Sequence, residues 1–124
     1  MGYSQPKILT FRAGGTIARG KAVKFGSADD TVVVGAGATD DCIGIAQNAA
    51  ESGDFVEVAL PGGGGLALSQ TTVTRGMLMV SHTDGALKPI AAANDRVVAM
   101  AMASGSANDL IPVEVLACQA TATE

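Results

Sequence analysis

The sequence is short of aromatic residues, and this shortage limits both its core and its ligands. It contains no tryptophan, and its aromatic residues are Tyr3, Phe11, Phe25 and Phe55. The core must therefore be built from small aliphatic side chains that pack closely. A host- or glycan-binding surface remains an alternative function, but the chain offers such a surface few aromatic rings on which a sugar could stack.

Cysteine and histidine are equally scarce. Cys42 and Cys118 form no metal or redox motif, and we expect both to be small, buried, reduced side chains. Their separation in sequence leaves a disulfide between them open. The sole histidine, His82, precedes a Thr83-Asp84-Gly85 turn, and the sequence places no nucleophile or acid beside it. We expect a solvent-facing turn residue and no enzymatic activity.

Positive charge is also limited. Eight Lys and Arg stand against twelve Asp and Glu, a net charge of −4, and the cations are scattered along the chain. Phosphate backbones attract clustered cations, so we expect no direct binding of nucleic acid. No apolar run approaches the roughly 20 residues that span a bilayer, and the N-terminal sequence has no signal-peptide pattern. We therefore expect no membrane partner and synthesis in a cytoplasm.

The remaining candidates for a reactive site lie in loops. The carboxylate pairs Asp29-Asp30 and Asp40-Asp41 lack further oxygen ligands at calcium-loop spacing, and we expect solvated turns rather than metal ligands or glycosidase acids. Gly62-Gly63-Gly64-Gly65 lacks the lysine and helix of a phosphate loop and predicts a flexible connector. Gly35-Ala36-Gly37-Ala38 lacks the third glycine of a dinucleotide site. We therefore predict no metal and no cofactor.

Glycine, in contrast, is abundant, and it accompanies short apolar runs. Sixteen glycines in 124 residues suit tight turns better than helices, where each interior glycine costs about 1 kcal/mol. Strand-like runs at spacings of roughly 8–12 residues are typical of an all-β barrel or sandwich. The expected strands cover residues 8–13, 21–25, 31–34, 42–47, 55–60, 66–68, 77–81, 87–90, 96–101 and 111–116.

Two segments need a closer interpretation. Pro89 and Pro112 lack an N–H, so we expect their strands at sheet edges or bulges. The alanine-rich segment 91–103 has a helix as its alternative, although its match with residues 42–46, where isoleucines flank a glycine, favours a strand.

Two stretches of sequence occur twice. Thr16-Ile17-Ala18-Arg19-Gly20 returns as Thr72-Val73-Thr74-Arg75-Gly76, 56 residues later (72 minus 16). Cys42-Ile43-Gly44-Ile45-Ala46 returns as Val97-Val98-Ala99-Met100-Ala101, 55 residues later (97 minus 42). Blocks in the same order at almost one spacing predict two copies of one β module.

A third stretch extends the repeat. Residues 52–58 return as residues 107–115, with extra residues near Pro112. This match puts Glu57 and Glu114 at corresponding places, as outward strand residues. Two copies are too few for a solenoid. We therefore predict an all-β fold with little helix, a small barrel or sandwich built from two similar β modules.

The domain boundaries follow from the repeat. The modules cover approximately residues 14–60 and 70–116 within a single β domain, residues 10–118. An N-terminal arm, residues 1–9, and a C-terminal tail, residues 119–124, flank that domain.

Several stretches of the chain resemble one protein family. Residues 13–24, 43–46 and 53–60, with the second copy from Val73 to Val113, resemble the capsid cement (decoration) proteins of tailed bacteriophages. The resemblance covers roughly residues 10–117. It implies a small β-rich structural protein of the virion that binds the outer surface of an icosahedral head and reinforces it. It implies no catalytic residues.

The resemblance also implies partners. One is the major capsid protein. The other is further copies of the chain, because symmetric homo-oligomers are the default assembly. Of the possible oligomers we favour a trimer over a dimer. The protein would be made in the host bacterial cytoplasm and reside on the outer capsid surface.

Five residues are candidates for contact with the capsid or a neighbouring subunit. Tyr3, Gln5 and Pro6 lie in the arm, which could add a strand to a neighbour's sheet; a disordered terminus is the alternative. Tyr3 is of a type enriched at interface hot spots. Arg19 and Arg75 precede matching turn glycines, as turn or surface residues or as partner contacts.

A different class of function stays open as the alternative. A small β-barrel enzyme or ligand-binding domain would place its site in the Gly-rich loops, with His82, Asp40 and Asp41 as the side chains to test.

Overall fold

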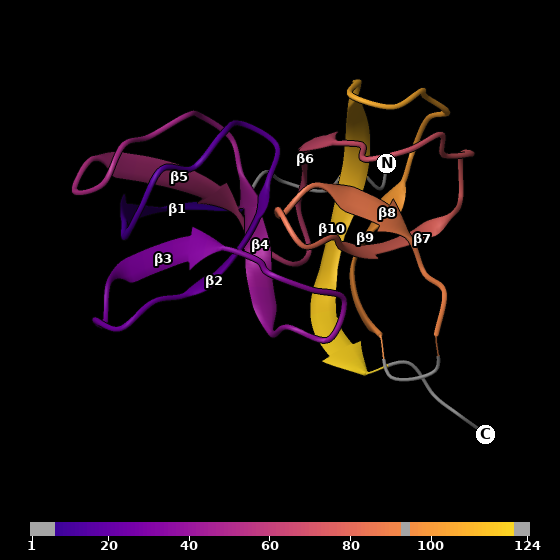
Figure 1. Ribbon diagram of the computed structural model, residues 1–124. Helices are drawn as coiled ribbons and strands as arrows, with labels where there is room; N and C mark the ends of the chain where they lie inside the picture. The colour runs from indigo at the N-terminus through magenta and orange to yellow at the C-terminus, as the bar shows by residue number, and fades with distance from the viewer. Residues whose placement is uncertain (1–6, 93–94, 121–124) are drawn as a thin grey trace.

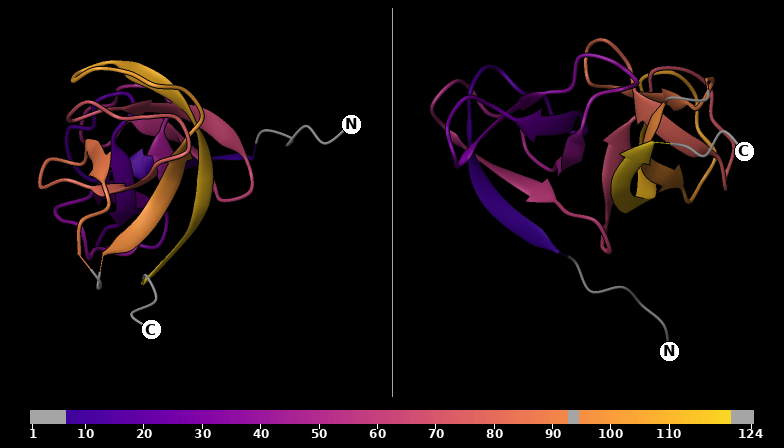
Figure 2. Two further views of the ribbon diagram at one scale, coloured as in Figure 1. Left: turned by 90° about the vertical axis from the view of Figure 1, so that its right-hand side faces the viewer. Right: turned by 90° about the horizontal axis from the view of Figure 1, so that it is seen from below.

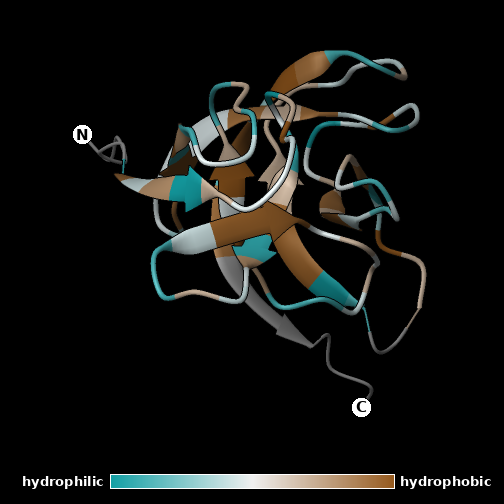
Figure 3. Cartoon of the chain, turned by 60° about the vertical axis from the view of Figure 1, so that its left-hand side comes forward, coloured by the Kyte–Doolittle hydropathy of each residue, from teal (hydrophilic) through white to brown (hydrophobic). Residues whose placement is uncertain are grey.

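The computed structural model describes residues 7–92 and 95–120, with side chains up to residue 116, and this part of the chain contains ten β-strands and no helix (Figure 1). The all-β prediction is confirmed. Apolar residues gather in the strands and polar residues in the loops (Figure 3). The strands are β1 (Ile8–Ala13), β2 (Ala22–Phe25), β3 (Thr31–Val34), β4 (Cys42–Ala46), β5 (Phe55–Ala59), β6 (Gly64–Leu68), β7 (Leu78–Ser81), β8 (Leu87–Pro89), β9 (Arg96–Ala101) and β10 (Leu110–Ala120).

The first five strands form a closed barrel, which we call the first unit. Their order is β1-β3-β2-β4-β5, and β1 closes the barrel by pairing antiparallel with β5 and parallel with β3. Alternation explains the inward face: Val56 and Val58 of β5 are fully buried, whereas Phe55 and Glu57 are exposed. The core of the unit is aliphatic.

The last five strands, the second unit, repeat this arrangement. Their order is β6-β10-β9-β7-β8, and a parallel bridge between Ser69 and Leu87 brings the segment after β6 against β8. The cyclic order therefore matches that of the first unit, with β6 in the place of β1 and β10 in the place of β5. Figure 2 shows the two units lying side by side.

The backbone hydrogen bonds of the two units correspond at the offsets of the sequence repeat. Ile17 and Ala50 exchange N–H···O bonds of 2.8 and 2.9 Å, as Val73 and Gly105 do at 2.9 and 3.1 Å. The bond from Gln47 to the Glu57 carbonyl corresponds to the bond from Met102 to the Pro112 carbonyl.

Pro112 therefore takes the place of Glu57, and no residues are inserted beside it. The expected match between Glu57 and Glu114 is wrong, because Glu114 corresponds to Ala59.

The two prolines lie in different kinds of strand. Pro89 lies in β8, at the edge of the sheet order, as predicted. Pro112 lies in β10, an interior strand, against the prediction. Its carbonyl accepts a bond from Met102, just beyond the end of β9, so its missing N–H faces no ladder partner.

Three further expectations differ from the structure. The helix alternative over 91–103 is wrong, because β9 supplies Val98, Ala99 and Ala101 to the core. The four glycines from 62 to 65 are no free connector, since Gly64 and Gly65 belong to β6. Strand β10 continues to Ala120, past the expected boundary at residue 118.

The two units meet through one face of the first unit and one end of the second. Ala22, Ile45 and Ala59 lie on the outer face of the first barrel, in register across β2, β4 and β5, and all are fully buried. They belong to the same hydrophobic cluster as the core of the second unit, and β4 contacts β6, β9 and β10. We call these three residues the plug row.

Polar contacts surround the plug row. Ala22 N–H donates to the Gly85 carbonyl at 2.7 Å, and Leu68 N–H donates to the Gly20 carbonyl at 2.9 Å. The Gln47 side chain accepts from Leu66 N–H at 3.1 Å and donates to the Leu66 carbonyl at 3.2 Å. The two units are thus joined by apolar packing and by backbone bonds across the junction.

Candidate functional site

Three of the five predicted contact residues, Tyr3, Gln5 and Pro6, lie outside the described residues. The other two, Arg19 and Arg75, are exposed and precede Gly20 and Gly76, whose φ angles are 88° and 89°. A positive φ at this position is typical of a type II turn. The two arginines occupy equivalent positions in two different units, so they do not form a common site.

The surroundings of the two turns nevertheless differ. A Cβ on Gly20 would lie 2.7 Å from the Leu68 nitrogen and 2.7 Å from Leu110 Cδ2, whereas a Cβ on Gly76 would meet nothing within 4 Å. The Arg19 turn therefore borders the junction between the units. The Arg75 turn stands at an open surface of the second unit.

The aspartates expected to be solvated hold loops in place. Asp40 accepts hydrogen bonds from Ala36 N–H at 2.6 Å and from Lys24 Nζ at 3.0 Å. Partial burial alone would raise the pKa of Asp40, but the Ala36 N–H and the Lys24 ammonium outweigh it and lower the pKa below its usual value. Asp41 forms an ion pair with Arg96 of β9. This loop of the first unit is thus linked to the second unit by an ion pair.

Asp95 repeats the role of Asp40 in the second unit. Its Oδ2 accepts from Ala91 N–H at 3.0 Å and from Ala92 N–H at 2.9 Å, and the residue is almost fully buried. The Ala91 bond lowers the pKa of Asp95; burial raises it, and the Ala92 bond and Lys88 lower it further. The repeat offset of 55 (95 minus 40) carries this match, which our sequence comparison missed.

His82 does not face solvent as expected. The side chain is half-buried, and its Nδ1 is buried without a hydrogen-bond partner among the described residues. Its backbone holds the turn: His82 N–H donates to the Ala86 carbonyl at 2.7 Å, and its own carbonyl accepts from Gly85 N–H at 3.0 Å. The turn packs on the first unit through Gly85, whose carbonyl accepts from Ala22 N–H at 2.7 Å.

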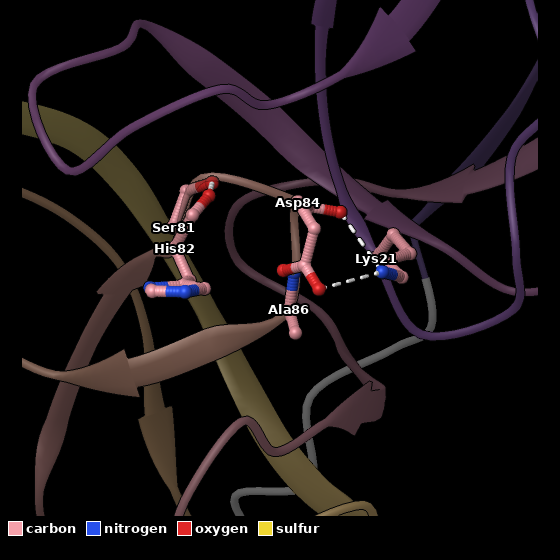
Figure 4. Close-up of polar contacts among 5 residues, drawn as sticks. All are labelled: Lys21, Ser81, His82, Asp84 and Ala86. Atoms are coloured by element: carbon pink, nitrogen blue, oxygen red, sulfur yellow. Dashed lines mark hydrogen bonds and ion pairs between the residues drawn. The ribbon is translucent and has the colours of Figure 1, made fainter.

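Figure 4 shows the ion pair that fixes this turn. Lys21 Nζ lies 3.4 Å from Asp84 Oδ2 and donates to the Asp84 carbonyl at 2.9 Å. Burial would raise the pKa of Asp84, but the Ala86 N–H and the charge of Lys21 lower it overall. The contact is structural: it attaches the second unit to β2.

One open cavity lies at the end of the first barrel. It measures about 440 Å³ and is lined by five large apolar residues, Leu9, Phe11, Phe25, Ile43 and Leu60, and also by Asp41, Cys42 and Pro61. Phe11 and Phe25 meet edge to face, with ring centroids 6.2 Å apart. Leu9 is 55% and Phe25 57% exposed. We call these five lining residues the mouth.

Our sequence reasoning did not single out the mouth. The signal lay in the repeat: Leu9, Phe11 and Phe25 stand where the second copy has Gly65, Ala67 and Ser81. Large apolar side chains at the end of one unit thus correspond to small ones in the other.

The described residues include no group of three or more His, Cys, Asp or Glu side chains arranged to hold a metal ion. Within the same residues, no helix is long and apolar enough to cross a bilayer. Cys42 is buried, as predicted, and the side chain of Cys118 lies outside the described part.

The fold defines a class: two tandem five-stranded β units joined end to face. Comparison with solved structures finds this fold in the crystal structure of the head fiber gp8.5 N base of bacteriophage phi29, with a TM-score of 0.70 at 15% sequence identity. The match covers 93% of this chain and 98% of that chain. No family model matches the sequence. No curated protein matches it either.

Proposed function

We propose that this chain is a structural protein of a phage virion. The observation that carries the proposal is the shared fold with the phi29 head fiber base, which extends over 93% of the chain. The sequence resemblance to phage capsid cement proteins supports the same class independently.

Within that class, we propose the particular role of a capsid decoration protein. It binds the major capsid protein on the outer surface of an icosahedral head and stabilises the shell. It is synthesised in the host bacterial cytoplasm. It uses no cofactor, catalyses no reaction, and binds neither nucleic acid nor a membrane directly.

The geometry suits a reinforcing role. The closed barrel of the first unit and the five-stranded second unit are joined by a packed junction into one body that can span adjacent shell subunits. Among the described residues, the exposed Arg75 turn offers one contact, and we expect the N-terminal arm with Tyr3, Gln5 and Pro6 to add a further contact. Several weak contacts from one symmetric homo-oligomer, which we propose to be a trimer, combine into high avidity.

Thermal release of the genome tests this role. Heads that lack the protein should release their genome at a lower temperature than complete heads, and adding back the purified chain should restore the release temperature. A folded protein that does not bind heads serves as the control for non-specific stabilisation. Equal robustness of heads with and without the chain would contradict the proposal.

A further inference from the structure

We propose that copies of this chain associate head to tail, with the second unit of one copy filling the mouth of the next. This interface rests on the homo-oligomer proposed above and does not depend on binding to the capsid. Within one chain, a face of the first unit packs on an end of the second unit. The matching end of the first unit and the matching face of the second unit are left for contact between copies.

Within the chain, the plug row covers one end of the second unit. The end residues there, Ala67, Val98 and Val115, are 0–1% exposed and belong to one hydrophobic cluster with the plug row. Their counterparts in the first unit are Phe11, Ile43 and Leu60, which are only half-buried and line the open mouth. The same end of the same fold is thus covered in one unit and uncovered in the other.

The second unit carries the counterpart of the plug row. Leu78, Met100 and Glu114 lie in register across β7, β9 and β10, as Ala22, Ile45 and Ala59 do across β2, β4 and β5. We call them the open row. Leu78 is 38% exposed, whereas its counterpart Ala22 is fully buried. Met100 and Glu114 are half-buried, so the row is only partly covered within the chain.

The border of the open row is apolar where the border of the plug row is polar. Lys21, which pairs with Asp84, corresponds to Met77, and Gln47, which bonds Leu66, corresponds to Met102. Met102 is 49% exposed. Methionine side chains adapt their shape to irregular surfaces, and exposed apolar groups of this kind mark interaction surfaces.

The sizes of the side chains are complementary. Inside the chain, the small plug residues Ala22 and Ala59 share a hydrophobic cluster with Ala67. Nearby, Gly65 lies against Gln47 and Ser81 against Gly35. Between copies, Leu78 and Met100 are larger, and the mouth offers a cavity of about 440 Å³. The contact between the two units of one chain therefore shows the kind of contact that a second copy would make, and a second copy is the occupant we propose for the mouth.

This contact joins two different surfaces, so it is heterologous. Repetition of a heterologous contact gives a closed ring when its rotation closes, and an open filament otherwise. One substitution on either surface should block self-association.

Sedimentation velocity of the full chain over a concentration series provides the first test. The wild type should self-associate, and Phe25→Asp in the mouth and Leu78→Asp in the open row should each weaken association at least about tenfold, as loss of a central apolar contact does. Phe55→Asp is the matched control: it removes an aromatic residue that is 62% exposed outside both surfaces. A wild type that stays monomeric would overturn the proposal.

Mixing the two variants is the sharper test. Phe25→Asp keeps an intact open row, and Leu78→Asp keeps an intact mouth, so the mixture has one functional interface and should form a heterodimer. Each variant alone should remain monomeric. If the wild type associates but the mixture does not, the interface is not head to tail and the proposal is wrong.

Two further measurements keep these outcomes unambiguous. Circular dichroism and thermal unfolding establish that each variant is folded, and Leu9→Asp provides a second mouth variant should Phe25→Asp unfold. If Tyr3→Asp abolishes association and Leu78→Asp does not, the N-terminal arm occupies the mouth instead, and the proposed interface is overturned.

Discussion

Equivalent residues in the two units have different neighbours, and the turn glycines show this most directly. Gly20 and Gly76 share a positive φ, but only Gly20 lies against the other unit. Both positions therefore require a residue that tolerates a positive φ. Only at Gly20 does the junction also leave no room for a side chain.

We predict that Gly20→Ala destabilises the protein more than Gly76→Ala. An alanine at positive φ costs roughly 1–2 kcal/mol at either site. At Gly20 the new Cβ would also lie 2.7 Å from the Leu68 nitrogen, and such overpacking typically costs a further ~1–3 kcal/mol. Urea unfolding of both variants measures the difference. Equal losses would mean that the junction is not packed as described.

Buried carboxylates make stability depend on pH in the acid range. The folded-state pKa of Asp95 lies below its ordinary value of 3.8, so its ionised form stabilises the folded state. That contribution is complete above the unfolded-state pKa and is lost as pH falls through the folded-state pKa.

We therefore predict that Asp95→Asn loses about 1 kcal/mol of unfolding free energy at neutral pH and shows a smaller further loss below about pH 4 than the wild type. Denaturation at a series of pH values gives both quantities. Asp29→Asn, in an exposed turn, is the control. An unchanged pH dependence would show that the Asp95 carboxylate does not cause the loss of stability at acid pH.

At the scale of elements, the edge of β6 is covered by one side chain. Gln47 satisfies both the N–H and the carbonyl of Leu66, and the absent side chain of Gly65 leaves room for it. An exposed strand edge would otherwise invite pairing with another chain.

We predict that Gln47→Met, which installs the residue found at the equivalent position 102, lowers the unfolding free energy by about 2–4 kcal/mol. The variant loses three hydrogen bonds, two to Leu66 and one to the Ile45 carbonyl. Hydrogen exchange of the Leu66 amide should accelerate. Gln70→Met, at an exposed glutamine, should leave both unchanged. Continued protection of the Leu66 amide in Gln47→Met would contradict this role.

The elements themselves were largely predictable, because strand alternation is a local signal. The predicted bounds 31–34 and 96–101 are those of β3 and β9. Pro112 and the glycines 62–65 were misplaced because their roles depend on which strand lies next to them. The half-buried position of His82 likewise depends on tertiary packing, which no local pattern records.

For the whole molecule, the sequence repeat has the same offsets as the shared hydrogen bonds. The repeat does not specify which face of one unit meets which end of the other. That information lies in the differences between the copies, such as Phe11 against Ala67, rather than in their similarities. The mouth was missed for this reason.

The shared cluster at the junction predicts that the two units unfold together. Ile45→Ala, in the plug row, should cost about 2–5 kcal/mol and reduce amide protection in β6, β9 and β10 as well as in β4. Val56→Ala, in the core of the first unit alone, should affect the first unit before the second. Hydrogen exchange followed by mass spectrometry distinguishes these patterns. Unchanged protection of the second unit in Ile45→Ala would show that the units are independent.

A density map of the phage head, with and without this chain, tests the central claim most directly. The account predicts additional density on the outer surface of the shell, of a size and shape that fit the two joined units, in heads that contain the chain. Identical outer surfaces in the two maps would contradict it.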